Sequence, residues 1–180
     1  MSSMIILITG TPGVGKTTVS GTLAQKLNAH LIDINQLVNE KHIYTGVDEV
    51  RKYKIVDLDA LFDEITIIIN KINSKFIIVE GHLSHLYEKS DIVIVLRANP
   101  HVLEQRMKTK EWGEDKIREN IEAEAIDVCS YEAYEIHGDK TNEIDTSNIS
   151  HERVVDLMVD MIKGDKKFPV GSIDFLEYLK

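Results

Sequence analysis

A short stretch near the N-terminus carries the residue types and the spacing of a phosphate-binding loop. Gly10 is followed by four residues and then by Gly15, Lys16 and Thr17. Glycines let successive backbone amides point at one anion, and a helix that begins at Lys16 directs its positive dipole end at the same place. Lys16 would then reach the β- and γ-phosphates, and the Thr17 hydroxyl would bind Mg²⁺. The pattern predicts a site for a nucleoside triphosphate with Mg²⁺.

The residues on either side of the loop support this interpretation. Residues 4–8 form a continuous apolar run, which is typical of a strand buried on both faces. The residues after the loop place Val19, Leu23 and Leu27 on one stripe of a helix. A strand, a glycine-rich turn and a helix start therefore follow one another in the required order. The predicted nucleotide contacts are Gly10, Gly13, Val14, Gly15, Lys16, Thr17 and Thr18, with Arg106 from a later segment.

An acid and a histidine follow a second apolar run. Glu80 ends the run of residues 76–80, and His82 comes two positions later. Because ligands of open α/β sheets bind at the carboxyl ends of the strands, we predict that Glu80 binds Mg²⁺, directly or through water. His82 is a predicted catalytic residue that could orient a water or an acceptor oxygen. The alternative for His82 is a solvent-exposed loop histidine.

Basic residues gather around a charged hinge at residues 109–113. They are Arg97, Arg106, Lys108 and Lys110. Together they could form a lid whose cations close over the transferring phosphoryl group and exclude water. Arg97 and Arg106 are the predicted catalytic cations, whereas Lys108 and Lys110 could simply form a solvated helix end. Trp112 could stack on a base or complete the packing of the lid.

Strands alternate with helices along the whole chain. The predicted strands cover residues 4–8, 30–34, 76–80, 91–96 and 143–146, and the predicted helices cover about residues 16–27, 36–41, 58–72, 102–108, 114–136 and 150–162. Asp57, Asn99 and Ser150 are predicted caps and Gly164 a stop signal. This order predicts one doubly wound domain over residues 1–180, an α/β fold with a five-stranded parallel sheet flanked by helices.

Two further segments complete this domain. Residues 43–54 are polar and irregular in period, and we expect a surface excursion beside the site. Residues 165–180 are expected to form a tail helix docked on the body, with partner binding as the alternative.

The bulk composition restricts the class of protein. The chain has 180 residues, a formal net charge of -9 and a single cysteine, Cys129. This length suits one domain that needs no disulfide or metal to fold. The first apolar run is too short to span a bilayer and no basic region precedes it, so we expect a cytoplasmic protein that does not bind membranes. The acidic balance disfavours a broad nucleic-acid surface.

On these motifs the chain resembles the nucleoside monophosphate kinases, and within them most closely the adenylate kinase isoenzyme 6 family. The resemblance covers nearly the whole chain. It rests on the loop at residues 10–17, on the acid-x-histidine element at residues 80–82, and on the segments at residues 95–106 and 116–124. In this family the acid is typically aspartate, where this chain has Glu80.

The resemblance implies a P-loop kinase fold with a monophosphate-binding portion at residues 33–56 and a short lid at residues 108–114. It implies that ATP and AMP react to give two ADP, with AMP as the acceptor substrate, and a Mg-dependent ATPase activity in which His82 takes part. It also implies a role in small-ribosomal-subunit maturation, with a small-subunit ribosomal protein near the 3′ end of the small-subunit RNA as partner. Two alternatives stay open: an ATPase assembly factor with vestigial kinase activity, and a kinase for another small acceptor, such as another nucleoside monophosphate.

Overall fold

A five-stranded parallel sheet forms the centre of the computed structural model, which describes residues 3–49, 53–110 and 112–180. In spatial order its strands are β2 (His30–Asp33), β5 (Phe76–Glu80), β1 (Met4–Thr9), β6 (Ile92–Arg97) and β7 (Thr141–Asp145). The five predicted strands are all present, and the doubly wound α/β fold is confirmed. β1 lies in the middle of the sheet, where the order of the strands reverses, and ligands of such sheets bind beside this position.

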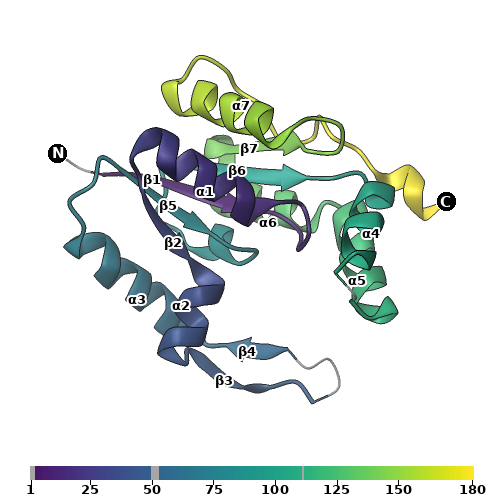
Figure 1. Ribbon diagram of the computed structural model, residues 1–180, viewed down its shortest axis with the longest axis horizontal. Helices are drawn as coiled ribbons and strands as arrows, with labels where there is room; N and C mark the ends of the chain where they lie inside the picture. The colour runs from purple at the N-terminus through teal and green to yellow at the C-terminus, as the bar shows by residue number, and fades with distance from the viewer. Residues whose placement is uncertain (1–2, 50–52, 111) are drawn as a thin grey trace.

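Helices cover both faces of the sheet (Figure 1). On one face lie α1 (Lys16–Leu27) and α7 (His151–Lys163), and on the other lie α3 (Leu58–Lys71) and α6 (Val128–His137). The remaining helices are α2 (Ile34–Lys41), α4 (Pro100–Lys108) and α5 (Glu114–Ala125). Short 3-10 turns are η1 (Ser84–Leu86), η2 (Gly138–Lys140) and η3 (Leu176–Leu179).

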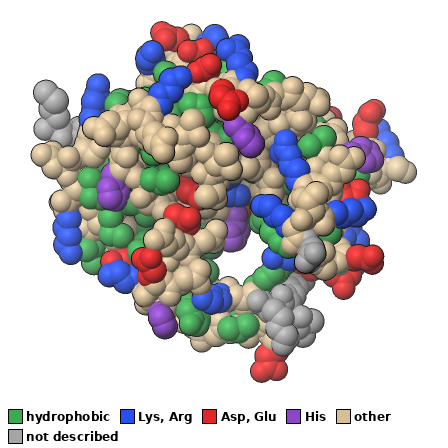
Figure 2. All heavy atoms as spheres, in the orientation of Figure 1, with side chains coloured by type: hydrophobic (Ala, Val, Ile, Leu, Met, Phe, Trp, Pro, Cys, Tyr) green, Lys and Arg blue, Asp and Glu red, His purple; other side chains and the backbone are tan. Residues whose placement is uncertain are grey.

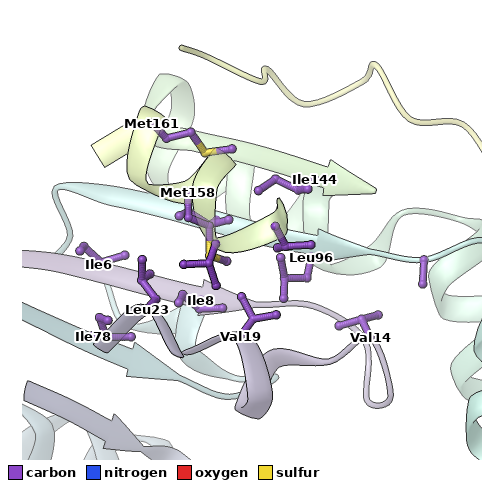
Figure 3. Packing of buried hydrophobic residues seen from close by; sticks show 14 of the residues in the cluster. Ile6, Ile8, Val14, Val19, Leu23, Ile78, Leu96, Ile144, Met158 and Met161 are labelled. Atoms are coloured by element: carbon purple, nitrogen blue, oxygen red, sulfur yellow. The ribbon is translucent and has the colours of Figure 1, made fainter. Parts of the chain in front are cut away.

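The alternation of side chains along β1 explains the two layers. Ile6 and Ile8 pack in the cluster of α1 and α7, whereas Leu7 packs in the cluster of α2, α3 and α6. Figure 3 shows Ile6 and Ile8 with Leu23 of α1 and Met158 of α7. Because both faces of β1 are covered, every residue of the strand interior must be apolar, and this is why the continuous apolar run predicted it.

The helix ends follow the local signals in the sequence. Asp57 accepts a hydrogen bond from the Ala60 amide, and Asn99 accepts one from the His101 amide with Pro100 at the start of α4. The predicted Ser150 cap and Gly164 stop are also confirmed. Caps act within one turn of the chain, so the sequence contains all the information that they need.

The predicted long helix over residues 114–136 is wrong. The chain forms α5 and α6 instead, and between them Asp127 takes a left-handed φ of 60°. This turn brings the Asp127 carboxylate to the buried guanidinium of Arg97, which donates a hydrogen bond to it. We attribute the break to this long-range ion pair, which the apolar period of the segment does not reveal.

The segment at residues 43–54 is more regular than expected. It contains β3 (Tyr44–Val47) and β4 (Lys54–Val56), which pair as an antiparallel hairpin. Thr45, Val47 and Ile55 are β-branched residues that favour this structure. Of the predicted monophosphate-binding portion at residues 33–56, residues 50–52 lie outside the described residues, as does residue 111 of the predicted lid.

The tail at residues 165–180 is docked on the body, but the predicted tail helix is wrong. Only the 3-10 turn η3 forms near its end. The Glu143 carboxylate of β7 accepts hydrogen bonds from the amides of Gly171, Ser172 and Ile173 at 2.9–3.1 Å. Pro169 and the left-handed Gly171, with φ of 95°, prevent a continuous helix here. In the described part of the chain, no helix combines the length and the apolar character needed to cross a membrane.

We expect Gly10→Ala to destabilise the fold. Gly10 has a φ of 134°, and a Cβ at this position would lie 2.3 Å from the carbonyl oxygen of Leu96. The substitution should cost at least about 1–3 kcal/mol, because backbone of the central sheet would have to move. Gly21→Ala in α1 is the matched control: a Cβ there meets nothing within 4 Å, and the change should stabilise the protein by about 0.5–1 kcal/mol.

Urea unfolding of the two variants measures both effects. A Gly10→Ala protein as stable as the Gly21→Ala protein would contradict the close approach of the loop to β6.

Candidate active site

The loop that follows β1 has the backbone of an anion cradle. Gly15 caps α1 with a left-handed φ of 105°, so that the first amides of the helix face the loop. The Lys16 ammonium lies over the loop and donates hydrogen bonds to the carbonyl oxygens of Gly10 at 2.7 Å and Thr11 at 3.1 Å. Burial lowers the pKa of Lys16 from 10.5 to about 8. A phosphate chain in the cradle would restore a full counter-charge to this ammonium.

An oxygen pair for a divalent cation lies beside the loop. The Thr17 hydroxyl donates a hydrogen bond to the Glu80 carboxylate at 3.0 Å, so the two residues predicted to bind Mg²⁺ lie side by side, and their metal binding stays a prediction. Glu80 is 1% exposed, and burial raises its pKa above the usual value, with the charge of neighbouring Asp33 adding to the effect. A hydroxyl and carboxylates at one strand edge are the oxygen ligands that Mg²⁺ prefers, so these residues fit the ion.

His82, two residues after Glu80, faces the cleft next to the loop. Its side chain is exposed and lines the large cavity next to the loop. Desolvation within the cleft lowers the pKa of His82 to about 4, and the positive charge of Lys16 contributes. The imidazole is therefore neutral near pH 7 and can accept a hydrogen bond from a water or an acceptor hydroxyl.

A second histidine, His85, fixes the turn that carries His82. The His85 ring is 2% exposed, with Nδ1 at 2.7 Å from the Thr9 hydroxyl and Nε2 at 2.9 Å from the Glu132 carboxylate. Burial lowers the pKa of His85, so we assign a neutral ring that donates from Nε2 to Glu132. The His137 ring donates to the His85 carbonyl oxygen at 2.8 Å. These contacts tie η1 to β1 and α6.

The structure brings Arg106 to the end of the loop. Its guanidinium donates to the carbonyl oxygen of Thr146 at 2.9 Å and to that of Val14 at 3.4 Å. The Thr146 hydroxyl lies 3.2 Å from the same Val14 oxygen. Arg106 is half-buried and close to the cradle, so its predicted contact with the nucleotide stays a prediction that the placement favours.

Arg97 lies in a buried ion-pair network instead of facing the cleft. The side chain is 1% exposed, and its guanidinium contacts the carboxylates of Glu124 at 2.8 Å, Glu143 at 3.2 Å and Asp127. Glu124 is itself 2% exposed and also accepts hydrogen bonds from the Thr11 hydroxyl and the Ala98 amide. The predicted catalytic role of Arg97 stays a prediction that this arrangement does not favour.

A cavity of about 790 Å³ opens between the loop and the hairpin β3–β4. Thr11 and Pro12 of the loop line it on one side, and Lys54 of β4 and Lys116 of α5 line it as well. Figure 2 shows the hollow, with lysine or arginine side chains and a histidine at its rim. The rest of the lining is mostly apolar or amide, including Ile34, Asn35, Val38, Asn39, Val56, Leu83, Asn120 and Val128, and the carboxylates of Glu119 and Glu132 also line it. Its size and chemistry suit a small ligand with a flat ring and an anionic group.

Sequence reasoning missed Glu124 and His85. Glu124 lies one position before Ala125 on the buried stripe that begins at Ile117 and Ile121. A carboxylate on a buried stripe requires a cation, and this signal could have paired it with Arg97. His85 carries no comparable signal, because its partners come from β1 and α6. Cys129 lines the cavity, and burial raises the pKa of its thiol to about 11, so it stays protonated.

Comparison with known proteins decides the family. A family profile described as an AAA domain matches residues 6–127. A protein of Methanothermobacter thermautotrophicus, named "Putative adenylate kinase", is 40% identical over 97% of this chain and 99% of that protein. A protein of Thermococcus kodakarensis with the same name is 38% identical over 97% of this chain and 94% of that protein. The chain belongs to this archaeal adenylate kinase family.

Solved structures agree with the fold of this family. A shikimate kinase from Acinetobacter baumannii in complex with shikimate superposes with a TM-score of 0.66 at 15% identity, over 92% of this chain and 96% of that chain. A thymidylate kinase from Candida albicans superposes with a TM-score of 0.60 at 17% identity, over 91% and 92% of the two chains. At these identities the likeness shows the fold alone, which is that of the P-loop kinases.

We expect ATP binding to this adenylate kinase family member to weaken as the pH rises above about 8. The pKa of Lys16 is about 8 in the free protein, and a bound triphosphate must raise it because it favours the charged form. Affinity should be constant below that pH and fall by up to about tenfold per pH unit above it, until the pKa of the bound state is reached.

Dissociation constants at about pH 7 and about pH 9 measure the effect, and the phosphates of ATP are already ionised in this range. Lys16→Arg is the control, since arginine stays charged and should remove the pH dependence. The same dependence of ATP affinity on pH in both proteins would rule out titration of Lys16 as the cause.

We expect Arg97→Ala to destabilise the protein by about 3–5 kcal/mol, because Glu124 and Glu143 would remain buried without a counter-charge. Arg118→Ala is the control: its pair with Asp115 is exposed, and the loss should stay below about 1 kcal/mol. Urea unfolding compares the two. If Arg97→Ala kept full stability and lost only turnover, a direct catalytic role would be favoured instead.

Proposed function

We propose that the protein is an adenylate kinase that transfers the γ-phosphoryl group of ATP to AMP and gives two ADP. The observation that carries this proposal is the cavity of about 790 Å³ that borders the phosphate-binding loop at Thr11 and Pro12. A triphosphate held by the loop would therefore present its end to a second ligand in the cavity. The names of the archaeal relatives support AMP as that ligand.

The donor half of the reaction would use the loop and its neighbours. The loop amides and Lys16 bind the β- and γ-phosphates, and Arg106 steadies the end of the loop through Val14. Thr17 and Glu80 would hold Mg²⁺, which when bound neutralises charge on the phosphate oxygens. Because the transferred group needs little covalent help from the protein, positioning and charge neutralisation supply most of the rate.

The acceptor half would use the cavity. Its apolar walls suit a nucleobase, and Asn35, Asn39 and Asn120 offer amide groups to the base edge. His82 lies between the two halves and would orient the attacking oxygen. When AMP is absent, the same imidazole could orient a water, and we propose a slow ATPase activity on this basis.

A switch-like role is the second candidate. If hydrolysis through His82 dominates over transfer to AMP, the protein would be an ATPase whose cycle serves another process. The maturation of the small ribosomal subunit, with a ribosomal protein as partner, is the process that the family resemblance suggests. This candidate differs from the first in one measurable quantity, the free phosphate released per ADP formed.

The test measures ADP and free phosphate from ATP and Mg²⁺, with and without AMP. We expect AMP to stimulate ADP formation without matching phosphate release, and Lys16→Ala to lower this transfer by about a hundredfold or more. His82→Ala should reduce the AMP-independent phosphate release by about a hundredfold. Lys166→Ala is the control, because its ammonium pairs with Asp160 at 2.7 Å and should not affect either rate.

Phosphate release at one slow rate, whether or not AMP is present, would reject the kinase and favour the ATPase. If a panel of acceptors contained a better substrate than AMP, the proposed acceptor would change and the proposed reaction class would stay the same. Full activity of Lys16→Ala would reject both.

A further inference from the structure

The cavity beside the loop has few cations for a second phosphate. Among the described residues that line it, the ammonium groups are those of Lys54 and Lys116. Lys16 lies on the loop, and Arg97 and Arg106 are bound to other groups outside the lining. If the proposed function holds, the acceptor enters this cavity as a phosphate dianion and must be neutralised there. Among the described residues of the lining, these two lysines are the groups that could do so.

Lys116 is held in the cavity by aromatic rings. It lies in the first turn of α5, with its ammonium 4.2 Å from the centre of the Trp112 ring and 5.0 Å from that of Tyr53. Trp112 belongs to the segment between α4 and α5, whereas Tyr53 precedes β4, so the cation joins two sides of the cavity mouth. In the part of the chain that the structure describes, this ammonium contacts the two neutral rings and forms no ion pair with a carboxylate.

Lys54 is held in a similar way on the hairpin. Its ammonium lies 4.5 Å from the centre of the Tyr44 ring and donates a hydrogen bond to the side-chain oxygen of Asn39. Cation–π contacts at partly exposed rings are weaker than charge-assisted hydrogen bonds to phosphate. A phosphate within reach would therefore draw both ammonium groups from their rings. Lysine suits this exchange, since its flexible stem carries a compact charge with rotatable donors.

We propose that Lys116, assisted by Lys54, binds the phosphate of the acceptor nucleotide, and that the Trp112 and Tyr53 rings hold this cation while the site is empty. Lys116 then makes the site selective for an acceptor with a phosphate group, whereas the apolar and amide lining binds the base of the acceptor. When the Lys116 ammonium moves to the phosphate, Trp112 and the hairpin would either separate or both move toward the ligand. This inference rests on the proposed function.

The kinetic test compares Lys116→Gln with the wild type. We expect KM for AMP to rise about ten- to hundredfold, as for the loss of one charge-assisted hydrogen bond, with KM for ATP changed less than about twofold. Lys116→Arg keeps the charge and should recover much of the affinity. Lys166→Gln is the control: it removes a lysine whose ammonium pairs with Asp160 at 2.7 Å and does not line the cavity.

A binding test is independent of turnover. Trp112 is the only tryptophan of the chain, so its fluorescence reports directly on the ring beside Lys116. Titration of the wild type with AMP should change the emission as the ammonium leaves the ring. Lys116→Gln should start from a shifted emission and show the same ten- to hundredfold loss of AMP affinity.

The outcomes separate the two proposals. An unchanged AMP affinity in Lys116→Gln, or a rise in KM for ATP in place of AMP, would overturn the role of Lys116. If the wild type still forms ADP in response to AMP, the proposed kinase activity is retained in that case. If the wild type neither binds AMP nor forms ADP in response to it, the proposed function fails and this inference fails with it.

Discussion

A buried guanidinium is the constraint on which the rest of the structure depends. Arg97, 1% exposed at the end of β6, requires carboxylates around it, because an unpaired charge in the interior is strongly destabilising. Glu124 comes from α5, Glu143 from β7 and Asp127 from the turn between α5 and α6. The Glu143 oxygen that does not contact Arg97 accepts hydrogen bonds from amides of the tail. Glu124 also accepts a hydrogen bond from Thr11 of the phosphate-binding loop. One cation therefore fixes the positions of the loop, α5 and the tail relative to the sheet.

The local parts of this fold could be predicted from the sequence, and the long-range parts could not. The loop glycines, the apolar strands and the caps at Asp57 and Ser150 act within a few residues of chain, so their signals are complete in the sequence. The break at Asp127 and the turn held by His85 depend on partners that are 30 and 76 residues distant in Arg97 and Thr9. The sequence assigns Thr17 and Glu80 to the metal from their own local context, the loop motif and the end of an apolar strand. It assigns Arg97 to catalysis from the basic residues around the hinge, because its buried carboxylate partners come from distant segments.

The two halves of the candidate site differ in how strongly the surrounding structure restrains them. The donor half lies on β1, β5 and the start of α1, where backbone hydrogen bonds and buried side chains restrict movement. The acceptor half is bounded by a two-stranded hairpin and by the segment before α5, which contact each other through Lys116 and two rings. Such contacts are individually weak, so this half can rearrange around a ligand at small cost. A kinase needs this difference, because the transferred group must stay in place while the acceptor enters and water is excluded.

The pairing of acids explains how a chain with a net charge of -9 could bind the two anionic nucleotides of the proposed reaction. Near the site, Glu124, Glu143 and Asp127 are neutralised by Arg97, and Glu132 is hydrogen-bonded to His85. The charge of Glu80 would be offset by a divalent cation that also binds the Thr17 hydroxyl. The loop amides and the ammonium groups of Lys16, Lys54 and Lys116 then place positive charge where the phosphates would lie, although the surface as a whole is acidic. Because this positive charge comes from a few placed lysines and not from a broad basic surface, the arrangement would favour small phosphorylated ligands over polyanions such as nucleic acids.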